Sequence, residues 1–556
     1  MNSANRHQFR QVVLRTGLAA AIILVASLSI VGQRRERTVD GWKPVHYDVE
    51  LIFNDQLTEL SSAKADISVQ ILRAGLRKLD FDFGELPVDS VMISGKAAQF
   101  ERSPGKLEVM LPQTIASNTR LQVTVTYHGR PKDGLIFAKD KDGSPSATGD
   151  NWPDRVHHWV PVLDHPSAKA TVNFTVSTPQ RYQVIANGKL IGVTPNATNS
   201  NWRFEESKAI PPYCMVVTVN EGTMIEPPDA AITKLIYNVP QADKQYAIQG
   251  FSAAGPSLAF FSQTIAPYPY EKLALIVAAT RFGGMENSSA IVFTSTLFNS
   301  RQNERISSRF GIPARIEEVV AHEIAHQWFG DSVTEATWAD LWLSEGFATY
   351  FAGLFVEKYD GEAAFRDYMR EKANGYFGYA KQTGKPLHDT ATEDLMQLLN
   401  PNNYEKGAWV LHMLRGRLGD EAFFKGLRAY YQAHKEGTAT TEDLRQALEK
   451  SSGKNLRNFF ARWVYESGHP RYELSWGSFE RRSATQVTVR LAQLQEGEPF
   501  LDPVPIEFTV KGKPVRQTIY PKGKLTTVSV RLDGNPTAVK IDPDETLLKE
   551  VAGIKP

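Results

Sequence analysis

Two histidines that stand four residues apart, His322 and His326, constrain this chain more than any other feature of its sequence. Apolar and small residues surround them, and Pro313 precedes the run as a helix-start signal. On an α-helix, residues i and i+4 lie on one face, so both imidazoles point toward a common centre. This is the arrangement that a tetrahedral zinc ion needs, and Glu323 would then flank the metal within reach of a water molecule.

The pattern H-E-x-x-H has only three fixed letters, so ordinary helices also match it by chance. A second feature favours a metal site, because Glu345 follows His326 after eighteen intervening residues, in the helical-looking segment 343–350. Gly330-Asp331 interrupts the chain between them, so two helices can fold back on each other. A carboxylate on the second helix leaves a fourth position for water, which is the pattern of a catalytic zinc. We therefore predict one Zn²⁺ per chain, held by His322, His326 and Glu345.

Charge and cysteine content narrow the class of protein. The 63 Lys and Arg residues balance 62 Asp and Glu residues, for a formal net charge of +1. Without long basic runs, this balance argues against nucleic acid as a partner. The one cysteine, Cys214, excludes an intramolecular disulfide and a multi-cysteine zinc site. Its apolar neighbours predict a buried strand residue.

Residues 1–38 have the features of an export signal or membrane anchor. Three arginines precede an apolar run over residues 17–31, and three more follow it. The run has the length of a signal-peptide core and is shorter than the ~20 residues of a comfortable membrane span. We expect a signal that is either cleaved or kept as an anchor. The protein would then be exported, and be periplasmic, extracellular or membrane-anchored facing outward.

The remaining sequence predicts an α+β multidomain fold. Period-two alternation, as in residues 121–127, predicts an N-terminal β-sheet domain over residues 39–228. Helical patterning then extends from roughly Asn238 to Pro470, within a domain at residues 229–470. Alternation returns afterwards, with turns that contain Gly and Pro, so residues 471–556 are expected to form a small C-terminal β-sandwich.

The zinc motif also carries a resemblance. H-E-x-x-H, eighteen residues and then the glutamate of W-x-x-L-W-L-x-E-G-F-A resemble the gluzincin aminopeptidases, the family of membrane alanyl aminopeptidase (aminopeptidase N) and leukotriene hydrolase. The thermolysin branch is less similar, because its third ligand is one residue more distant and the E-G-F-A context is absent. The resemblance covers about residues 40–470. It implies a thermolysin-like, mainly helical catalytic domain and peptide substrates with a free N-terminus. Ser344 and Asp331 each stand where the family usually has Asn, and neither position is a ligand.

Two further motifs gain a meaning from this resemblance. G-G-M-E-N could by itself be a turn with an exposed acid, but it is similar to the family's exopeptidase motif. The resemblance implies that its glycines let the backbone approach the substrate and that Glu286 pairs with the free α-ammonium. The substrate-binding residues would be Gly283, Gly284, Met285, Glu286 and Asn287. Tyr404 matches the family's Y-x-K-G tyrosine, which implies a hydrogen bond to the oxyanion. Glu323 is expected to act as the general base, and later to protonate the leaving amine.

Two departures from the family concern the N-terminal domain. Residues 159–170 resemble the signature W-x-P-x-x-D-E-P-S-x-K-A, with His165 in place of Glu. His157, His158 and His165 lack a spacing that would gather them around a metal, so we expect a structural role for this segment. Trp152 stands where the family places a Gln or Glu that helps to hold the substrate amine. That contact is expected to fall to a neighbour or to be absent.

Two other functions compete with a zinc aminopeptidase. An endopeptidase of the thermolysin kind would have no use for Glu286, which argues against it. A catalytically inactive family member, used as a binding scaffold, would not be expected to combine the base, the three ligands and Tyr404. Many family members continue into a helical solenoid that covers the active site, whereas this sequence ends after its β region. We therefore expect an open cleft that admits longer peptides.

Overall fold

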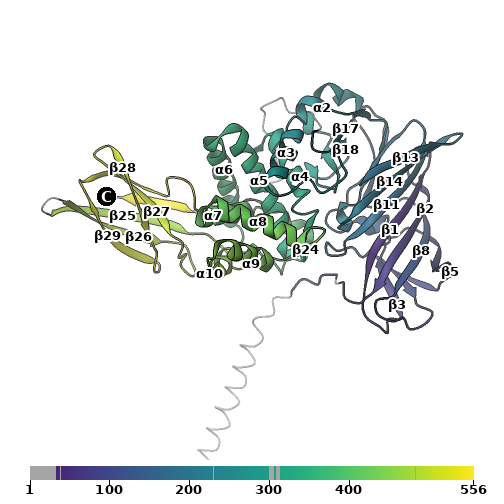
Figure 1. Cartoon of the computed structure of the whole chain (residues 1–556), viewed down its shortest axis with the longest axis horizontal. Coiled ribbons are helices and arrows are strands. Elements are labelled where there is room, and N and C mark those ends of the chain that lie inside the picture. The colour runs from purple at the N-terminus through teal and green to yellow at the C-terminus, as the bar shows by residue number, and fades with distance from the viewer. Residues whose placement is uncertain (1–32, 38, 229–230, 300–305, 308–312, 482–483) are drawn as a thin grey trace, which may run out of the picture.

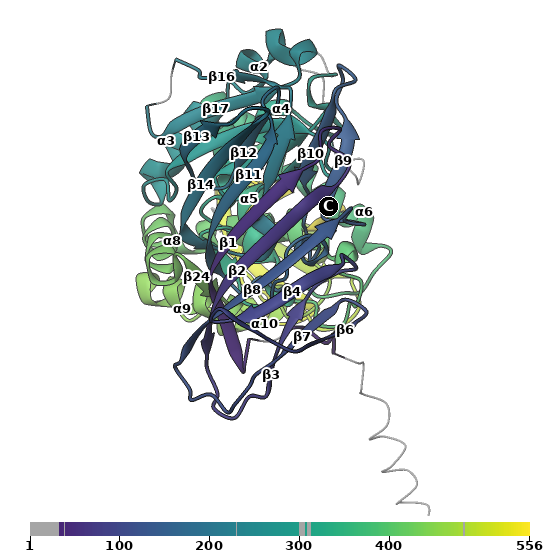
Figure 2. The ribbon, with the colours of Figure 1, turned by 90° about the vertical axis from the view of Figure 1, so that its right-hand side faces the viewer.

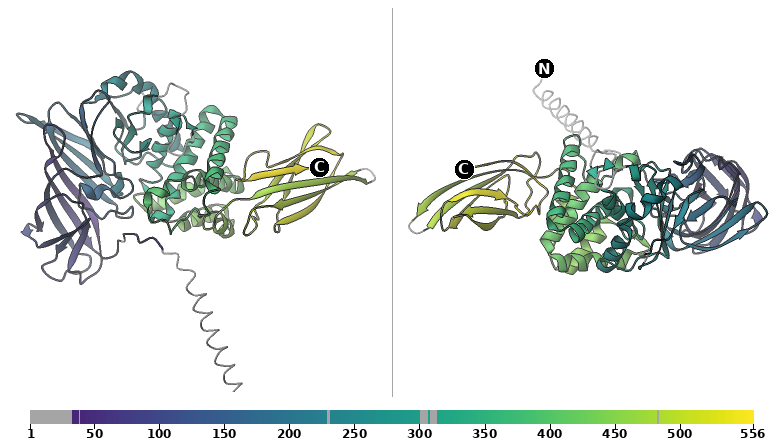
Figure 3. Two further views of the ribbon diagram at one scale, coloured as in Figure 1. Left: turned by 180° about the vertical axis from the view of Figure 1, so that it is seen from behind. Right: turned by 90° about the horizontal axis from the view of Figure 1, so that it is seen from above.

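The computed structural model describes residues 33–37, 39–228, 231–299, 306–307, 313–481 and 484–556. Figure 1 shows three parts in a row, with β-sheets at one end, helices in the middle and a pair of small sheets at the other end. Views from behind and from above show the same order (Figure 3). The expected α+β multidomain fold is confirmed. The apolar run at residues 17–31 lies outside the described residues. Among the helices that the structure describes, none has the length and apolar character that a membrane crossing requires.

The N-terminal part is built on an eight-stranded sheet. Its strands lie in the order β13 (Lys189–Pro195), β14 (Asn199–Ile210), β11 (Ala170–Pro179), β1 (Trp42–Phe53), β2 (Leu60–Ile71), β8 (Arg120–Gly129), β4 (Val88–Ile93) and β5 (Lys96–Ala97). β2 pairs antiparallel with both β1 and β8, and buried side chains alternate with less buried ones along it. This alternation is the pattern of a sheet with one face on a core. Figure 2 shows the long strands of the sheet side by side.

Two smaller sheets complete the N-terminal part. One contains β12 (Gln183–Ala186), β15 (Val217–Asn220), β10 (Pro145–Gly149) and β9 (Leu135–Lys139). The other contains β3 (Lys78–Asp82), β7 (Lys106–Met110) and β6 (Phe100–Ser103). Cys214 lies between β14 and β15 in a short 3₁₀ turn, Pro212–Cys214, and is fully buried. The prediction of a buried strand residue was therefore right about burial and wrong about the strand, because Pro211 and Pro212 end the preceding strand.

A five-stranded sheet joins the N-terminal part to the helices. Its order is β16 (Thr223–Ile225), β17 (Lys234–Val239), β18 (Lys272–Ala278), β20 (Ala290–Thr294) and β19 (Gly284–Met285). Every residue of β18 is buried, and β18 runs parallel to both β17 and β20. Helical structure begins soon after Asn238, as predicted, with α2 (Lys244–Gly250) and α3 (Ala254–Thr264), but the strands β18, β19 and β20 then interrupt it before the main helical region.

The helical region follows this sheet. It contains α4 (Ile316–His326), α5 (Trp342–Asp360), α6 (Glu362–Ala380), α7 (Gly407–Leu418), α8 (Asp420–His434), α9 (Thr441–Ser452) and α10 (Arg457–Trp463). The short strands β21 (Ile306–Ser307), β22 (Pro313–Ala314), β23 (Val333–Glu335) and β24 (Gly437–Ala439) lie between or before these helices. α5 is buried on all sides from Trp342 to Val356, so neighbouring helices surround it. It ends before Gly361, whose φ of 92° stops a helix, and the side chain of Thr440 caps α9 by accepting from the backbone N–H of Asp443.

The C-terminal part consists of two facing sheets. One contains β29 (Leu525–Leu532), β26 (Ala484–Gln493), β25 (Arg471–Arg481) and β31 (Glu550–Lys555), and the other contains β28 (Lys513–Ile519), β27 (Val504–Val510) and β30 (Pro536–Ile541). Alternate residues of both sheets, such as Val487 and Ile506, meet in a separate apolar core. This packing confirms the expected small C-terminal β domain.

The close crossing of α5 and α7 depends on two glycines. A Cβ atom added to Gly346 would lie 2.9 Å from backbone atoms of Gly407. We expect Gly346→Ala to lower the free energy of unfolding by ~1–3 kcal/mol, because backbone cannot yield as a side chain can. Gly378→Ala is the matched control, since nothing lies within 4 Å of its added Cβ on α6. It should instead stabilise the protein by up to ~1 kcal/mol. Chemical denaturation measures both changes, and equal effects would contradict the tight crossing.

Candidate metal centre and substrate site

Three predicted ligand atoms meet between α4 and α5. Nε2 of His322 and Nε2 of His326 are 3.1 Å apart, and Oε2 of Glu345 lies 3.3 Å from the first and 3.4 Å from the second. A tetrahedral zinc with metal–ligand distances of about 2.0–2.2 Å needs ligand atoms roughly 3.3 Å apart. The three residues therefore form one face of a tetrahedron of the right size.

The surroundings of these atoms also fit a cation. Nδ1 of His326 lies 3.1 Å from Ser344 Oγ and 3.2 Å from the carbonyl oxygen of Phe329. A proton on Nδ1 can donate to these oxygens, which leaves the lone pair of Nε2 directed at the centre. Oε2 of Glu345 is buried and has no hydrogen-bond partner, although both imidazoles are near. Lone pairs that face one another in this way require a positive charge between them.

The ionisation of the three residues is consistent with a cation bound between them. Burial raises the pKa of Glu345, but the charge of His326 and the close contacts with the imidazoles of His322 and His326 lower it to about 2. Burial lowers the pKa of His322 to about 4. Burial also lowers the pKa of His326, yet the carboxylate of Glu345 raises it to about 10. An anionic Glu345 and a neutral His322 are the forms that bind a metal. The negative field that raises the pKa of His326 equally attracts a divalent cation.

Tyr404 approaches the ligands from a π-helical turn, Asn402–Lys406, that leads into α7. Its hydroxyl donates a hydrogen bond of 2.8 Å to Oε1 of Glu345, and its ring lies parallel to that of His322 at 5.9 Å. Burial raises the pKa of Tyr404 well above its ordinary value, so the phenol keeps its proton and remains a donor. The structure thus places Tyr404 beside the metal ligands, and its role at an oxyanion stays a prediction.

Glu323 lies on α4 against the short strand β19. A Cβ atom on Gly284 would overlap the carboxylate of Glu323, so only glycine lets this strand lie so close to the expected base. Around Gly283 there is open space within 4 Å. The two glycines therefore differ, because Gly284 makes room for Glu323 and Gly283 leaves space beside the strand. Burial, with the nearby charges of Glu286 and Glu345, raises the pKa of Glu323 well above its ordinary value against the opposing charge of His326.

Glu286 follows β19 and reaches the same centre. Its side chain is buried, and carboxylate oxygens of Glu286 and Glu323 lie within 4.8 Å of each other and of a ring nitrogen of His326. Burial raises the pKa of Glu286 to about 7, with Glu345 adding to the increase and His326 opposing it. A buried carboxylate of this kind gains most from a cationic partner. Met285 and Asn287, the other buried members of the motif, are 1% and 0% exposed.

Trp152 and its neighbours offer no second polar contact for an amine. The ring of Trp152 packs edge-on against Trp338 at 5.7 Å and against Phe282 at 6.1 Å. The carboxylate of Asp150 accepts hydrogen bonds from Thr280 and Arg281, and the side chain of Asn151 bonds the carbonyl of Met215 and the indole of Trp159. The side chains of Asp150 and Asn151 are thus already engaged within the protein, and the contact of Glu286 with a substrate amine stays a prediction.

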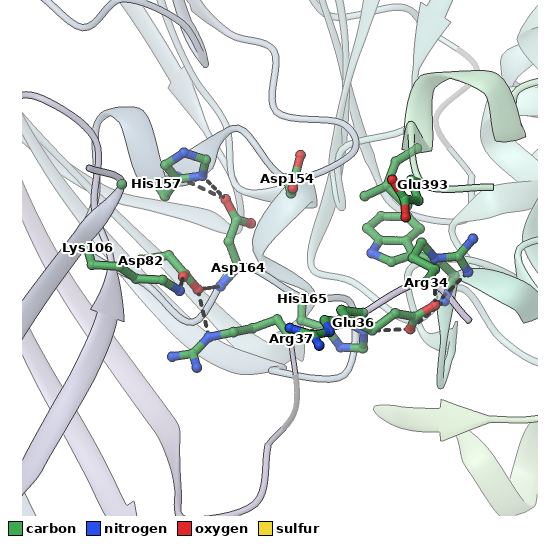
Figure 4. Close-up of a pocket in the computed structure, with 14 residues that line it drawn as sticks. Arg34, Glu36, Arg37, Asp82, Lys106, Asp154, His157, Asp164, His165 and Glu393 are labelled. Carbon is green, nitrogen blue, oxygen red and sulfur yellow. Dashed lines mark hydrogen bonds and ion pairs between the residues drawn. The ribbon is translucent and has the colours of Figure 1, made fainter. Parts of the chain in front are cut away.

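The histidines of the N-terminal segment lie at the junction between the β-sheets and the helical region. Nδ1 of His157 is 2.9 Å from Asp164, and Nε2 of His165 is 3.2 Å from Glu36. Figure 4 shows both pairs at the wall of a cavity of about 440 Å³, to which Arg37 and Lys106 also contribute. Each of these two imidazoles pairs with a carboxylate, and Glu36 also accepts a hydrogen bond from the backbone N–H of Trp338, so His165 is linked through Glu36 to the helical region.

Sequence reasoning missed two residues that support the site. The sequence marks Ser344 only as a position where the family usually has Asn, but its hydroxyl contacts the ring of His326. Gln327 was not singled out at all, although its side chain bonds the backbone of Glu286. A weak signal existed, because a glutamine inside an otherwise apolar, buried stretch needs hydrogen-bond partners.

The chain matches two family models. The "Peptidase M1 N-terminal domain" matches residues 43–214, and the "Peptidase family M1 domain" matches residues 251–463. The second range contains all three predicted ligands, together with Glu323, Glu286 and Tyr404.

Curated relatives support the same comparison. A "Probable aminopeptidase 1" of Saccharolobus solfataricus is 26% identical over 482 residues, which are 84% of this chain and 59% of the relative. A "Leucyl aminopeptidase" of the same organism is 25% identical, over 81% of this chain and 54% of the relative. "Aminopeptidase M1" of Arabidopsis thaliana is 29% identical, over 56% of this chain and 36% of the relative. The aligned part of the chain thus spans between 36% and 59% of the length of these relatives.

The hydrogen bond between Nδ1 of His326 and the hydroxyl of Ser344 predicts an effect on metal affinity. Ser344→Ala should weaken zinc binding by roughly tenfold or more, because the ring of His326 loses an oriented partner. Ser257→Ala is a suitable control, since Ser257 is equally buried but its hydroxyl has no partner. Competition with a chromogenic chelator measures the dissociation constant of zinc. Equal affinities of wild type and Ser344→Ala would show that Ser344 does not support the ligand.

Proposed function

Because the chain belongs to the M1 family of peptidases, we propose that it is a zinc aminopeptidase that removes the N-terminal residue of peptides. The position of Glu286 is the observation that carries this proposal. Its buried carboxylate stands within 4.8 Å of both Glu323 and His326, so an ammonium bound there lies about one residue from the metal ligands. A substrate anchored by its free amine therefore presents its first peptide bond to the centre.

Each residue has a distinct part in the proposed reaction. A zinc ion bound by His322, His326 and Glu345 supplies a Lewis acid for the water and the scissile carbonyl. Glu323 accepts a proton from the attacking water, and then gives it to the nitrogen of the leaving peptide. Tyr404 keeps its phenolic proton and donates it as a hydrogen bond where negative charge develops.

Two alternatives have less support. An endopeptidase binds chain on both sides of the scissile bond, whereas the carboxylate of Glu286, next to strand β19, offers a site for a cationic amine at one side of the ligands. An inactive scaffold would not need the base, and yet Gly284 makes room for the carboxylate of Glu323.

We also propose that the protein is exported. The support is the sequence of residues 1–38, where an apolar run stands between two groups of arginines. Whether this segment is cleaved or remains as an anchor decides if peptides are met in solution or at a membrane surface. Cell fractionation with an antibody to the catalytic region tests the proposal, and a cytoplasmic pool alone would contradict it.

The role of Glu323 as the base predicts a separation of metal binding from activity. Glu323→Gln keeps the shape of the side chain and removes the proton acceptor, so zinc should stay at about one ion per chain while kcat falls by roughly 10²–10⁴-fold. Elemental analysis and turnover of an aminoacyl amide measure the two quantities on one preparation. Turnover close to that of wild type would assign the base to another group.

The role of Glu286 predicts a change in substrate preference. A charge-assisted hydrogen bond to a buried carboxylate contributes ~1.5–3 kcal/mol, so Glu286→Ala should lower kcat/KM for free-amine substrates by roughly ten- to two-hundredfold. Slow turnover of the N-acetylated analogue should change much less, because that substrate lacks the ammonium. Equal losses on both substrates would mean that Glu286 does not bind the amine.

A further inference from the structure

Gln327 is the residue immediately after the predicted ligand His326, and its side chain is fully buried. Its amide nitrogen donates to the carbonyl oxygen of Glu286 at 2.9 Å and to Oδ2 of Asp331 at 2.8 Å. Its amide oxygen accepts from the backbone N–H of Ser289 at 2.8 Å and from the hydroxyl of Tyr268 at 3.2 Å. A side-chain amide can make two bonds as a donor and two as an acceptor, so that of Gln327 is saturated.

Two of these four bonds hold one turn. Glu286 and Ser289 stand at its two ends, and the amide of Gln327 bonds the backbone of both. The other two bonds, to Asp331 and Tyr268, fix the plane of the amide, so it cannot flip without placing its NH₂ against the N–H of Ser289. Gln327 thus joins the turn that carries Glu286 to the end of the helix that carries the histidines.

The turn itself is strained. Ser289 has a φ of 62°, in the left-handed region that non-glycine residues rarely occupy. Such a conformation persists only where the surroundings impose it. On the sheet side, Nζ of Lys272 donates to the carbonyl of Ser289 at 2.7 Å, and the hydroxyl of Ser289 donates to Glu206 at 3.1 Å. On the helix side, the amide of Gln327 holds the N–H of the same residue.

We propose that Gln327 is a positioning residue, which sets the separation between the amine anchor Glu286 and the metal ligands. This inference rests on the proposed aminopeptidase function and names the part of the chain that limits removal to one residue. His326 and Gln327 are consecutive, so the backbone at the end of α4 links the ligand directly to the side-chain amide that bonds the turn. A misplacement of about 1 Å between reacting groups can cost a hundredfold in rate, and hydrogen bonds of this kind hold the turn within a smaller tolerance.

The test compares two glutamines whose side-chain amides each bond a backbone carbonyl and a backbone N–H. Gln493, at the end of β26 in the C-terminal part, also donates to a carbonyl, that of Phe500 at 2.7 Å, and accepts from the N–H of Phe500 at 2.8 Å. It is 5% exposed. Gln327→Met and Gln493→Met each remove a buried side-chain amide that bonds a backbone carbonyl and a backbone N–H. Each substitution keeps a similar side-chain volume. Both variants are expected to lower Tm, but only the first touches the amine anchor.

The expected result separates positioning from a general loss of stability. Gln327→Met should raise KM for free-amine substrates by roughly ten- to a hundredfold and lower the preference for free over N-acetylated substrates, at unchanged zinc content. Gln493→Met should leave KM and this preference at the wild-type values. If Gln327→Met does not fold, Gln327→Glu decides, because it keeps the acceptor for Ser289 and removes both donors. If either Gln327 variant folds and keeps the wild-type KM and the wild-type preference for free amines, the proposal is overturned.

A readout without catalysis completes the test. Hydrogen exchange of the backbone amides at residues 286–290 should become faster in the Gln327 variants and stay unchanged in Gln493→Met. Unchanged exchange would refute the positioning role even if the protein proved to have another activity. A wild type that shows no preference for free amines would instead refute the proposed function.

Discussion

The convergence of two imidazoles and one carboxylate in a buried space is the constraint on which the catalytic region depends. Their ligand atoms stand 3.1–3.4 Å apart, and the Oε2 atom of Glu345 has no hydrogen-bond partner. Without a cation, this arrangement of lone pairs is unfavourable. The rest of the fold maintains it, because α4 and α5 must cross at a fixed angle and α7 must approach α5 at Gly346 and Gly407. Tyr404 reaches Glu345 through that approach.

The substrate side of the site is built on the same helix. Gly284 lies against the carboxylate of Glu323, and the amide of Gln327 bonds both ends of the turn that begins at Glu286. The amine anchor is therefore tied to α4, the helix that carries the base and two of the three ligands, although Glu286 lies in a separate region of the sequence. This design explains how a strained turn such as that at Ser289 can be kept in register with a metal.

The sequence predicts the parts of this site that follow from helical periodicity or from a family motif. His322 and His326 are found from their spacing of four, and Glu345 from the break at Gly330-Asp331 and the second helix behind it. It could not predict Gln327, because three of the four partners of that amide, Tyr268, Glu286 and Ser289, are distant in sequence and meet it only in the folded chain. Nor could it place Trp152, which packs into an aromatic cluster with Trp338 and Phe282. The helical patterning predicted from about Asn238 onward also did not show the strand β20 (Ala290–Thr294), since short apolar runs look alike in either state.

The central claim is that the free N-terminus of a peptide is held at a fixed distance from the metal ligands. A time course by mass spectrometry, with the zinc-loaded wild-type protein, a decapeptide and its N-acetylated twin, tests this claim most directly. We predict that the free peptide shortens from its N-terminus one residue at a time, while the acetylated twin stays intact over the same period. Internal fragments from the acetylated twin, at a rate comparable to the loss of the free peptide, would contradict the account.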